Sequence, residues 1–242
     1  MEWLYGRHAV LEALRAGRRK VHRVHISPGV RRTGNAAEII AAAQGRGCPV
    51  IEANPGQLER LGPVNHQGFA AEAAAYPYVD LDQLLPGPAA SPPLYLALDH
   101  LQDVQNLGTL LRTAEAMGVD GVLLPERRSA EITPAVVNAS AGAVEYLPIA
   151  RVVNLVQALE TLKGRNVWVA GLEAGPGAVP LGKADLGGAL ALVVGAEGAG
   201  LSRLVRERCD WLLSIPMYGR IESLNAAVAG SIVLVAARQA RA

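Results

Sequence analysis

A glycine-rich segment at residues 189–202 is the part of this chain best suited to bind a ligand. It reads ALALVVGAEGAGLS, so a buried strand runs into Gly195, Gly198 and Gly200. The backbone there can approach a ligand closely because no side chains intervene. The order G-x-x-G-x-G differs from the G-x-G-x-x-G of dinucleotide loops, and Glu197 would be badly placed beside a pyrophosphate. The pattern favours a neutral or cationic adenosyl ligand over a nicotinamide cofactor.

Two further segments place polar residues directly after apolar, strand-like runs. Residues 98–118 read LDHLQDVQNLGTLLRTAEAMG, in which Asn106 suits a helix cap and Arg112 lies six residues on. From spacing alone, Arg112 is most simply an exposed helix arginine. Residues 214–237 read SIPMYGRIESLNAAVAGSIVLVAA, in which Ser223 suits the cap of a very apolar helix. That helix must be buried against a sheet or a second subunit.

The elements that position these segments alternate strongly apolar strands with helices. Strands are predicted at residues 93–99, 121–125, 166–172, 189–195 and 211–216. Helices are predicted at residues 107–118, 134–142, 152–164 and 202–209. Continuous apolar strands alternating with helices indicate an α/β fold with a parallel sheet covered on both faces. Ligands bind such sheets at the carboxyl ends of the strands, where the three segments collect.

A proline-rich stretch, YPYVDLDQLLPGPAASPP at residues 76–93, divides the chain. We therefore expect one domain at residues 1–76, a linker at 77–92 and a second domain at 93–242. The first domain is predicted to be a small α/β sandwich without a catalytic constellation. Its helices are expected at residues 8–17, 36–47 and 54–62, and its strands at 21–27, 48–53 and 68–74.

The overall charge gives little information about partners. The formal net charge is +1, which argues neither for nor against nucleic acid. Basic residues nevertheless crowd into the first domain, at Arg15, Arg18, Arg19, Lys20, Arg23, Arg31 and Arg32. Such a cluster could contact phosphates, although a solvated helix end would look much the same.

The sequence carries no signal for secretion, membrane insertion or a metal site. Its first residues lack the pattern of a signal peptide, and the apolar stretch 226–237 is shorter than the about 20 residues that cross a bilayer. Cys48 and Cys209 have neither zinc spacing nor a nearby partner, which fits a reducing compartment. We expect a soluble, cytoplasmic protein with no metal and no membrane partner.

Together, the three segments closely resemble the SpoU (TrmH) family of RNA ribose 2′-O-methyltransferases. The family's motifs are matched by N-L-G…L-R-T-A at 106–114, V-G-A-E-G-x-G-L at 194–201 and I-P-M…S-L-N-x-x-V-A at 215–229. The resemblance covers essentially the whole chain. YGRHAVLEAL at 5–14, HQGFAAEA at 66–73 and TPAVVNASAGAVEYLPIARVVNL at 133–155 look like the branch that methylates a guanosine of 23S rRNA.

This resemblance implies a fold and a cofactor. The fold is a SPOUT-type parallel sheet in a homodimer, with a C-terminal trefoil knot that no pattern would suggest, since chains as a rule do not thread loops. The front domain is then an RNA-binding domain similar to ribosomal protein L30e. The knot loops are expected to hold S-adenosylmethionine largely through backbone atoms, at Gly195, Ile215 and Leu224, with Met217 and Gly198 close by.

The resemblance also implies a set of catalytic residues. It favours Arg112 as the base, but a guanidinium stays protonated in nearly every protein. Stabilising the developing alkoxide or gripping a phosphate is a more plausible role for Arg112. Asn106 and Glu197 are expected to position Arg112 and the ribose. Ser223 and Asn225 are expected to order the cofactor loop.

The sequence departs from the family pattern at two positions, and three alternative functions stay open. Asp103-Val104 stands where the family commonly has Asp-Pro, and Ala227 stands where it often has Ser. The chain could instead be a non-catalytic RNA-binding protein, or it could methylate a transfer RNA. A nucleotide-dependent oxidoreductase is disfavoured by the glycine spacing. RNA is the expected partner, and no DNA is expected.

Overall fold

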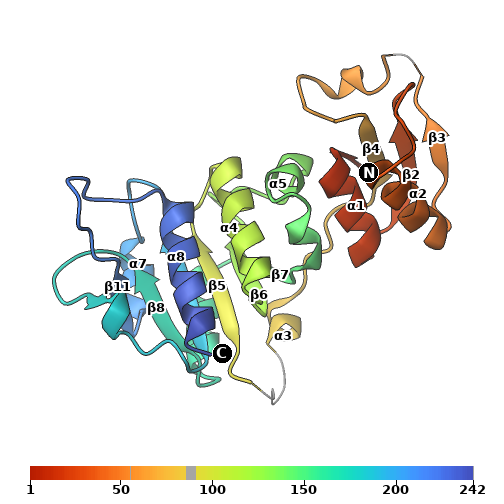
Figure 1. The fold of residues 1–242 in the computed structure, drawn as a ribbon. Coiled ribbons are helices and arrows are strands. Elements are labelled where there is room, and N and C mark those ends of the chain that lie inside the picture. Colours follow the sequence, from red (N-terminus) through yellow and green to blue (C-terminus); the bar gives the residue numbers. More distant parts are fainter. Residues whose placement is uncertain (55, 86–90, 242) are drawn as a thin grey trace. The chain divides into compact units, whose positions relative to one another are not determined.

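The computed structural model describes residues 1–54, 56–85 and 91–241 (Figure 1). The chain forms two compact units: Met1–Pro77 with Ile132–Tyr146 is unit 1, and Tyr78–Glu131 with Leu147–Ala242 is unit 2. The predicted division did not foresee that residues 132–146 leave the second part of the chain to join unit 1. Residues 86–90 of the predicted linker lie outside the described residues.

Unit 2 contains the predicted parallel sheet. The order of its seven described strands is β7-β6-β5-β10-β8-β11-β9, and every neighbouring pair is parallel. The bounds are β5 Leu94–Asp99, β6 Gly121–Pro125, β7 Ile149–Val152, β8 Trp168–Leu172, β9 Val179–Pro180, β10 Leu190–Gly195 and β11 Trp211–Ser214. Five of these strands were predicted. β7 and β9 were not, because neither is a long apolar run.

Helices cover both faces of this sheet, as the continuous apolar strands require. The helices of unit 2 are α3 Leu81–Leu84, α4 Val104–Ala116, α6 Leu155–Lys163, α7 Arg203–Arg208 and α8 Ala226–Gln239, with the short 3₁₀ helix η3 Leu181–Lys183. α6 and α7 pack on one face, where Leu159 and Val205 join a core with Val193 of β10. α4 and α8 lie side by side on the other face (Figure 1).

The contact between α4 and α8 is close because Gly230 has no side chain. A Cβ added there would lie 2.9 Å from Leu110 and 3.1 Å from Val194. The hydroxyl of Ser231 donates to Thr113 Oγ1 at 2.9 Å in the same contact. One face of α8 packs on the sheet, as expected, with Val233, Leu234 and Ala237 buried. Its outer face leaves Val228, Ile232 and Val235 substantially exposed.

Two predicted helix caps were wrong. α4 begins one turn earlier than expected, at Val104, and Asp103 accepts the backbone N–H of Asn106 at 2.7 Å. Asn225, rather than Ser223, caps α8 by accepting the N–H groups of Ala227 and Val228 at 3.0 and 3.2 Å. Asn106 and Ser223 therefore do not cap these helices.

Unit 1 is built on a mixed four-stranded sheet in the order β1-β4-β2-β3, in which only β2 and β3 are parallel. Its strands are β1 Glu2–Tyr5, β2 Val21–Ile26, β3 Val50–Glu52 and β4 Phe69–Ala73. Its helices are α1 Arg7–Ala16, α2 Asn35–Gly45, η1 Glu59–Leu61, α5 Pro134–Ala139 and η2 Ala143–Tyr146. β1 was not predicted. Gly17 ends α1 in the left-handed conformation, as expected of a glycine there.

A buried ion pair joins residues 132–146 to the rest of unit 1. The side chains of Arg19 and Glu145 are 1% and 0% exposed. Arg19 donates to both carboxylate oxygens of Glu145, and also to Glu2 at 2.8 Å and the carbonyl of Ala74 at 3.2 Å. Arg19 belongs to the basic cluster that could contact phosphates, and its burial in these contacts removes it from any such surface.

Arg15 of the same predicted cluster is also engaged, in ion pairs with Glu12 at 3.0 Å and Glu38 at 2.7 Å. Lys20, Arg31 and Arg32 are exposed. No described helix is long and apolar enough to span a membrane.

Candidate active site

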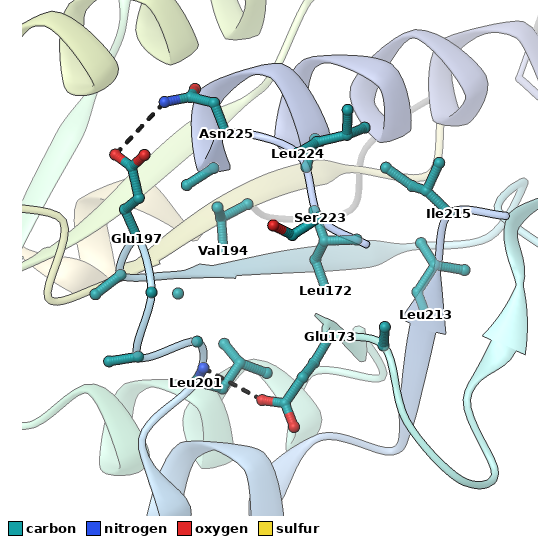
Figure 2. A pocket seen from close by; sticks show the side chains of 18 of the residues that line it. Leu172, Glu173, Val194, Glu197, Leu201, Leu213, Ile215, Ser223, Leu224 and Asn225 are labelled. Carbon is teal, nitrogen blue, oxygen red and sulfur yellow. Dashed lines mark hydrogen bonds between the residues drawn. The ribbon is translucent and has the colours of Figure 1, made fainter. Parts of the chain in front are cut away.

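A cavity of about 820 Å³ opens where β8, β10 and β11 end in unit 2. The strand ends contribute Leu172, Val194 and Leu213, and the chain after β11 contributes Ile215 and Met217. The segment before α8 closes the cavity from another side (Figure 2). Three segments that are distant in the sequence thus meet at the carboxyl edge of the sheet, where ligands of parallel sheets bind.

The glycine loop after β10 forms one wall of this cavity. Ala196 and Gly200 exchange two backbone hydrogen bonds, at 3.1 and 2.9 Å, so the loop folds back on itself. A Cβ at Gly195 would lie 2.3 Å from the carbonyl group of Gly200. Gly198 and Gly200 have φ values of +78° and +66°, which side chains rarely tolerate. The glycine spacing is therefore required by the loop itself.

Charged side chains give the cavity a negative character. The carboxylates of Glu173, Glu197 and Glu222 line it, against one guanidinium, that of Arg206. Glu173 accepts the N–H of Leu201 at 3.2 Å and pairs with Arg206 at 3.0 Å, so that guanidinium is already neutralised. An excess of carboxylates favours a ligand that carries positive charge.

A polar network connects the three segments at one end of the cavity. Asn106 donates to Glu197 Oε2 at 2.8 Å, and Asn225 donates to Asn106 Oδ1 at 2.9 Å. Asn225 also lies 3.5 Å from Glu197 Oε2, which Figure 2 shows as a dashed line. Because Asn225 caps α8 at the same time, the start of that helix fixes the network.

A second cavity of about 570 Å³ adjoins the first. His100, Asn106 and Arg128 line it, and it shares Glu197 and Gly200 with the first cavity. The glycine loop is thus a wall common to both. The two cavities are thus neighbouring compartments with a shared wall.

Cys209, in the turn before β11, offers no nucleophile to either cavity. Burial, together with the nearby charge of Asp210, raises the pKa of this thiol to about 12. A thiol with such a pKa is protonated at neutral pH and is unreactive. Cys209 is therefore best described as a small, partly buried apolar residue.

Comparison with known proteins gives the family. A model described as the SpoU rRNA Methylase family matches residues 93–235, and a model for RNA 2′-O ribose methyltransferase substrate binding matches residues 3–79. The chain belongs to the SpoU (TrmH) family. A Bacillus subtilis protein, YacO, assigned to the TrmH family of tRNA/rRNA methyltransferases, is 37% identical over 235 residues, covering 96% of this chain and 93% of that protein.

Solved methyltransferase structures share the fold. The SpoU methyltransferase AviRb from Streptomyces viridochromogenes, in complex with the cofactor AdoMet, has a TM-score of 0.81 at 25% identity, covering 99% of this chain and 90% of that one. An AdoMet-bound rRNA methyltransferase from Sinorhizobium meliloti has a TM-score of 0.80 at 29% identity, covering 98% and 87%. The predicted α/β fold with a parallel sheet is confirmed. The trefoil knot and the likeness to L30e stay predictions.

The structure gathers most of the residues that the SpoU motifs predicted. All five expected cofactor residues line the first cavity: Gly195, Gly198, Ile215, Met217 and Leu224. Glu197, Ser223 and Asn225 line it too, and Figure 2 shows Ser223 pointing into it. Asn106 lines the second cavity. The roles assigned to these residues stay predictions.

Arg112 is the exception. It is exposed on α4 and lines neither cavity. Sequence reasoning also missed Glu173, Glu222 and His100. Glu173 and His100 directly follow the predicted strands 166–172 and 93–99, and this position at a strand's carboxyl end was the available signal.

Proposed function

We propose that this SpoU protein transfers a methyl group from S-adenosylmethionine to a ribose 2′-hydroxyl of RNA. One observation carries the proposal: the glycine loop, the chain after β11 and the segment before α8 close around a single carboxylate-lined cavity. Its immediate neighbour is a second cavity that shares Glu197. Two solved structures with the same fold, a SpoU methyltransferase and an rRNA methyltransferase, contain AdoMet and support it.

The residues of the first cavity fit S-adenosylmethionine. Gly195 leaves backbone atoms within reach of a flat adenosyl group, because no Cβ fits there. Leu172, Ile215 and Leu224 supply apolar surface for an adenine ring. The excess carboxylate charge suits the ammonium and sulfonium groups of this molecule. When bound, it supplies a methyl group that is electrophilic because of the positive sulfur.

The chain's own residues then position the ribose. The Asn106–Glu197–Asn225 network stands at the boundary of the two cavities and holds the Glu197 side chain in place. Asn225 couples this network to α8, and Ser223 faces the cavity beside it. Fixed polar groups of this kind lower a barrier by orientation, on the order of 7 kcal/mol or more.

The RNA class is a finer part of the proposal. We propose a guanosine of 23S rRNA, with transfer RNA as the alternative. The substrate-binding model over residues 3–79 supports an RNA partner for unit 1. The similar protein of known structure from Sinorhizobium meliloti is named an rRNA methyltransferase. The Bacillus subtilis relative is assigned to a family named for both tRNA and rRNA. We place the reaction in the cytoplasm, where both RNAs occur.

The test is transfer of label from radioactive S-adenosylmethionine to purified RNA. Unmethylated 23S rRNA and unmodified transfer RNA are offered separately, and the labelled nucleoside is identified by mass spectrometry. We expect 2′-O-methylguanosine from 23S rRNA. Label in transfer RNA alone would indicate that transfer RNA, rather than 23S rRNA, is the substrate. Absence of label from both, with RNA still bound, would indicate a non-catalytic RNA-binding protein.

We propose that Arg112 grips an RNA phosphate. Its guanidinium is exposed, and no ion pair links it to a described carboxylate. Loss of a hydrogen bond to a charged group costs about 1.5–3 kcal/mol, so Arg112→Ala is expected to lower kcat/KM for RNA by roughly 10- to 150-fold. Arg112→Lys should retain part of the activity. Arg203→Ala, which removes an exposed arginine from α7, is the control, and full activity in Arg112→Ala would refute this role.

We also propose that the protein is a homodimer through α8. Val228, Ile232 and Val235 are 45%, 38% and 38% exposed, and their spacing places them along one helix face. An apolar stripe of this kind is covered in most soluble proteins. Ile232→Asp is expected to convert a dimer to a monomer in sedimentation velocity. Val153→Asp, at an exposed apolar residue after β7, should leave the dimer intact, and a dimeric Ile232→Asp protein would contradict the proposal.

A further inference from the structure

Glu173, the residue directly after β8, links several walls of the first cavity. Its backbone N–H donates to the carbonyl of Leu213 in β11 at 3.0 Å. Its Oε2 accepts the backbone N–H of Leu201, at the end of the glycine loop, at 3.2 Å. Its Oε1 lies 3.0 Å from Nε of Arg206 on α7. One residue therefore connects β11, the glycine loop and α7.

The Glu173 carboxylate is directed at the glycine loop. Figure 2 shows it turned toward the nitrogen of Leu201 and away from Leu224, which lies across the cavity. The side chain is 21% exposed, and each of its two oxygens has a partner in the chain. The carboxylate is thus engaged by the protein's own groups before any ligand enters the cavity.

The glycine loop is anchored in a similar way from its other side. The loop continues from β10, which lies between β5 and β8 in the sheet. Asp99 ends β5, and its Oδ2 accepts the backbone N–H of Ser202 at 2.6 Å. Carboxylates from the two flanking strands therefore hold two consecutive N–H groups, those of Leu201 and Ser202. Hydrogen bonds to a charged acceptor are about twice as strong as those between neutral groups.

The glycine loop needs such anchors because its composition makes it flexible. Gly198 and Gly200 have no side chains, and glycine loses more conformational freedom on ordering than any other residue. The two hydrogen bonds between Ala196 and Gly200 close the loop on itself but do not attach it to the neighbouring strands. A Cβ at Gly200 would lie 3.3 Å from Glu173 Oε2, so the loop backbone passes directly beside this carboxylate. Glu173 is therefore placed to select one shape of the loop.

Arg206 limits the effect that the charge of Glu173 has on a ligand. Its guanidinium is 47% exposed and pairs with the carboxylate, so the net charge that the two side chains present to the cavity is small. A neutralised pair attracts a cationic ligand only weakly. Glu173 should therefore act through the shape of the glycine loop rather than by attracting the sulfonium group.

Resting on the proposed function, we propose that Glu173 is a positioning residue for methyl transfer: it holds the glycine loop, before the cofactor arrives, in the shape that binds S-adenosylmethionine. Arg206 keeps the Glu173 side chain in place. Because the loop is already ordered in the folded protein, the cost of ordering it does not reduce the free energy of binding. Glu173 contacts neither the methyl group nor the ribose.

The test measures the Kd of the full-length protein for S-adenosylmethionine and for S-adenosylhomocysteine, whose sulfur is uncharged, by isothermal titration calorimetry. Glu173→Ala removes the acceptor of the Leu201 N–H, and we expect both Kd values to rise by the same factor, roughly 10- to 150-fold. Glu173→Gln keeps a neutral acceptor oxygen, so its Kd values should lie between those of the wild type and of Glu173→Ala. Glu207→Ala is the matched control and should bind both ligands as the wild type does. It removes an exposed carboxylate that pairs with Arg203 on α7 and lines neither cavity.

A second measurement follows the loop in the absence of a ligand. Amide hydrogen exchange of residues 196–202 in the cofactor-free protein, measured by mass spectrometry, should be faster in Glu173→Ala than in the wild type. Exchange in β10 should stay unchanged, because the effect is confined to the loop. Glu207→Ala should leave both segments unchanged.

Several results would overturn the inference. One is an unchanged Kd for both ligands in Glu173→Ala, and another is a rise confined to S-adenosylmethionine, because Glu173 then acts on the sulfonium charge. Equal rises without faster exchange in the loop overturn it as well, since Glu173 is then a direct contact of the ligand. Faster exchange throughout β10 does the same, because the loss is then one of general stability.

If Glu173→Ala does not fold, Glu173→Gln provides the same comparisons with smaller effects. Failure of the proposed function shows separately, as a wild-type protein that binds S-adenosylmethionine and places no methyl group on ribose.

Discussion

Gly195→Ala is expected to weaken S-adenosylmethionine binding severely. The added Cβ would lie 2.3 Å from the carbonyl carbon and oxygen of Gly200 and 2.6 Å from the nitrogen of Leu201. All three are backbone atoms of the cavity wall, so the loop itself must move. Overpacking of this kind costs about 1–3 kcal/mol, which corresponds to a roughly 5- to 150-fold rise in the Kd measured by isothermal titration calorimetry.

Gly219→Ala is the matched control for this experiment. Gly219 lies in the loop between β11 and α8, and a Cβ there would meet no described atom within 4 Å. Its Kd for the cofactor should equal that of the wild type. An unchanged Kd in Gly195→Ala as well would mean that the glycine loop does not shape the cofactor site.

Glu145→Ala is expected to destabilise unit 1 strongly. The substitution leaves the Arg19 guanidinium buried, with Glu2 as its remaining carboxylate partner. Burial lowers the pKa of Arg19, but hydrogen bonds and charge from Glu145 and Glu2 raise it by more, so the group is charged in the folded protein. Removing one partner of a buried pair costs about 3–5 kcal/mol, which urea unfolding should report as a lower midpoint.

Glu38→Ala serves as the comparison for a surface pair. Glu38 pairs with Arg15, and their side chains are 51% and 47% exposed. Exposed pairs contribute about 0–1 kcal/mol, so this variant should unfold near the wild-type midpoint. Equal midpoints for Glu145→Ala and Glu38→Ala would contradict the role assigned to the buried pair.

Local patterns were enough to predict the core of unit 2. The strands 94–99 and 190–195 are apolar at nearly every position because both of their faces are covered, and the structure buries every residue of both. β9, Val179–Pro180, has only two residues and gives no periodic signal. The caps Asp103 and Asn225 were missed because several adjacent residues have side chains that could cap each helix. Which of them does so depends on the residue at which the helix begins.

Long-range contacts explain the largest difference from the predicted organisation. The helix expected at 134–142 exists as α5, but its periodicity does not show which core it joins. That choice depends on the pairing of Glu145 with Arg19, 126 residues away in the chain. The prolines of residues 76–93, in contrast, are a local pattern in the sequence. They suggested a single boundary between two domains.

The candidate site shows a similar division between what was and was not predictable. The ordered motifs identified Gly195, Ile215 and Leu224 as neighbours, and the cavity contains all three. Glu173 and His100 are single residues after strands, so nothing in their spacing distinguishes them from ordinary loop residues. The exposed position of Arg112 agrees with the interpretation that its helical spacing alone favoured.

The central claim, methyl transfer to a ribose oxygen, is tested most directly by alkaline hydrolysis of the labelled RNA. A 2′-O-methyl group blocks base cleavage of the adjacent phosphodiester bond, because that cleavage needs the free hydroxyl. We predict that all enzyme-dependent label appears in an alkali-resistant dinucleotide. Label released in mononucleotides, as a methyl group on a base would be, contradicts the account.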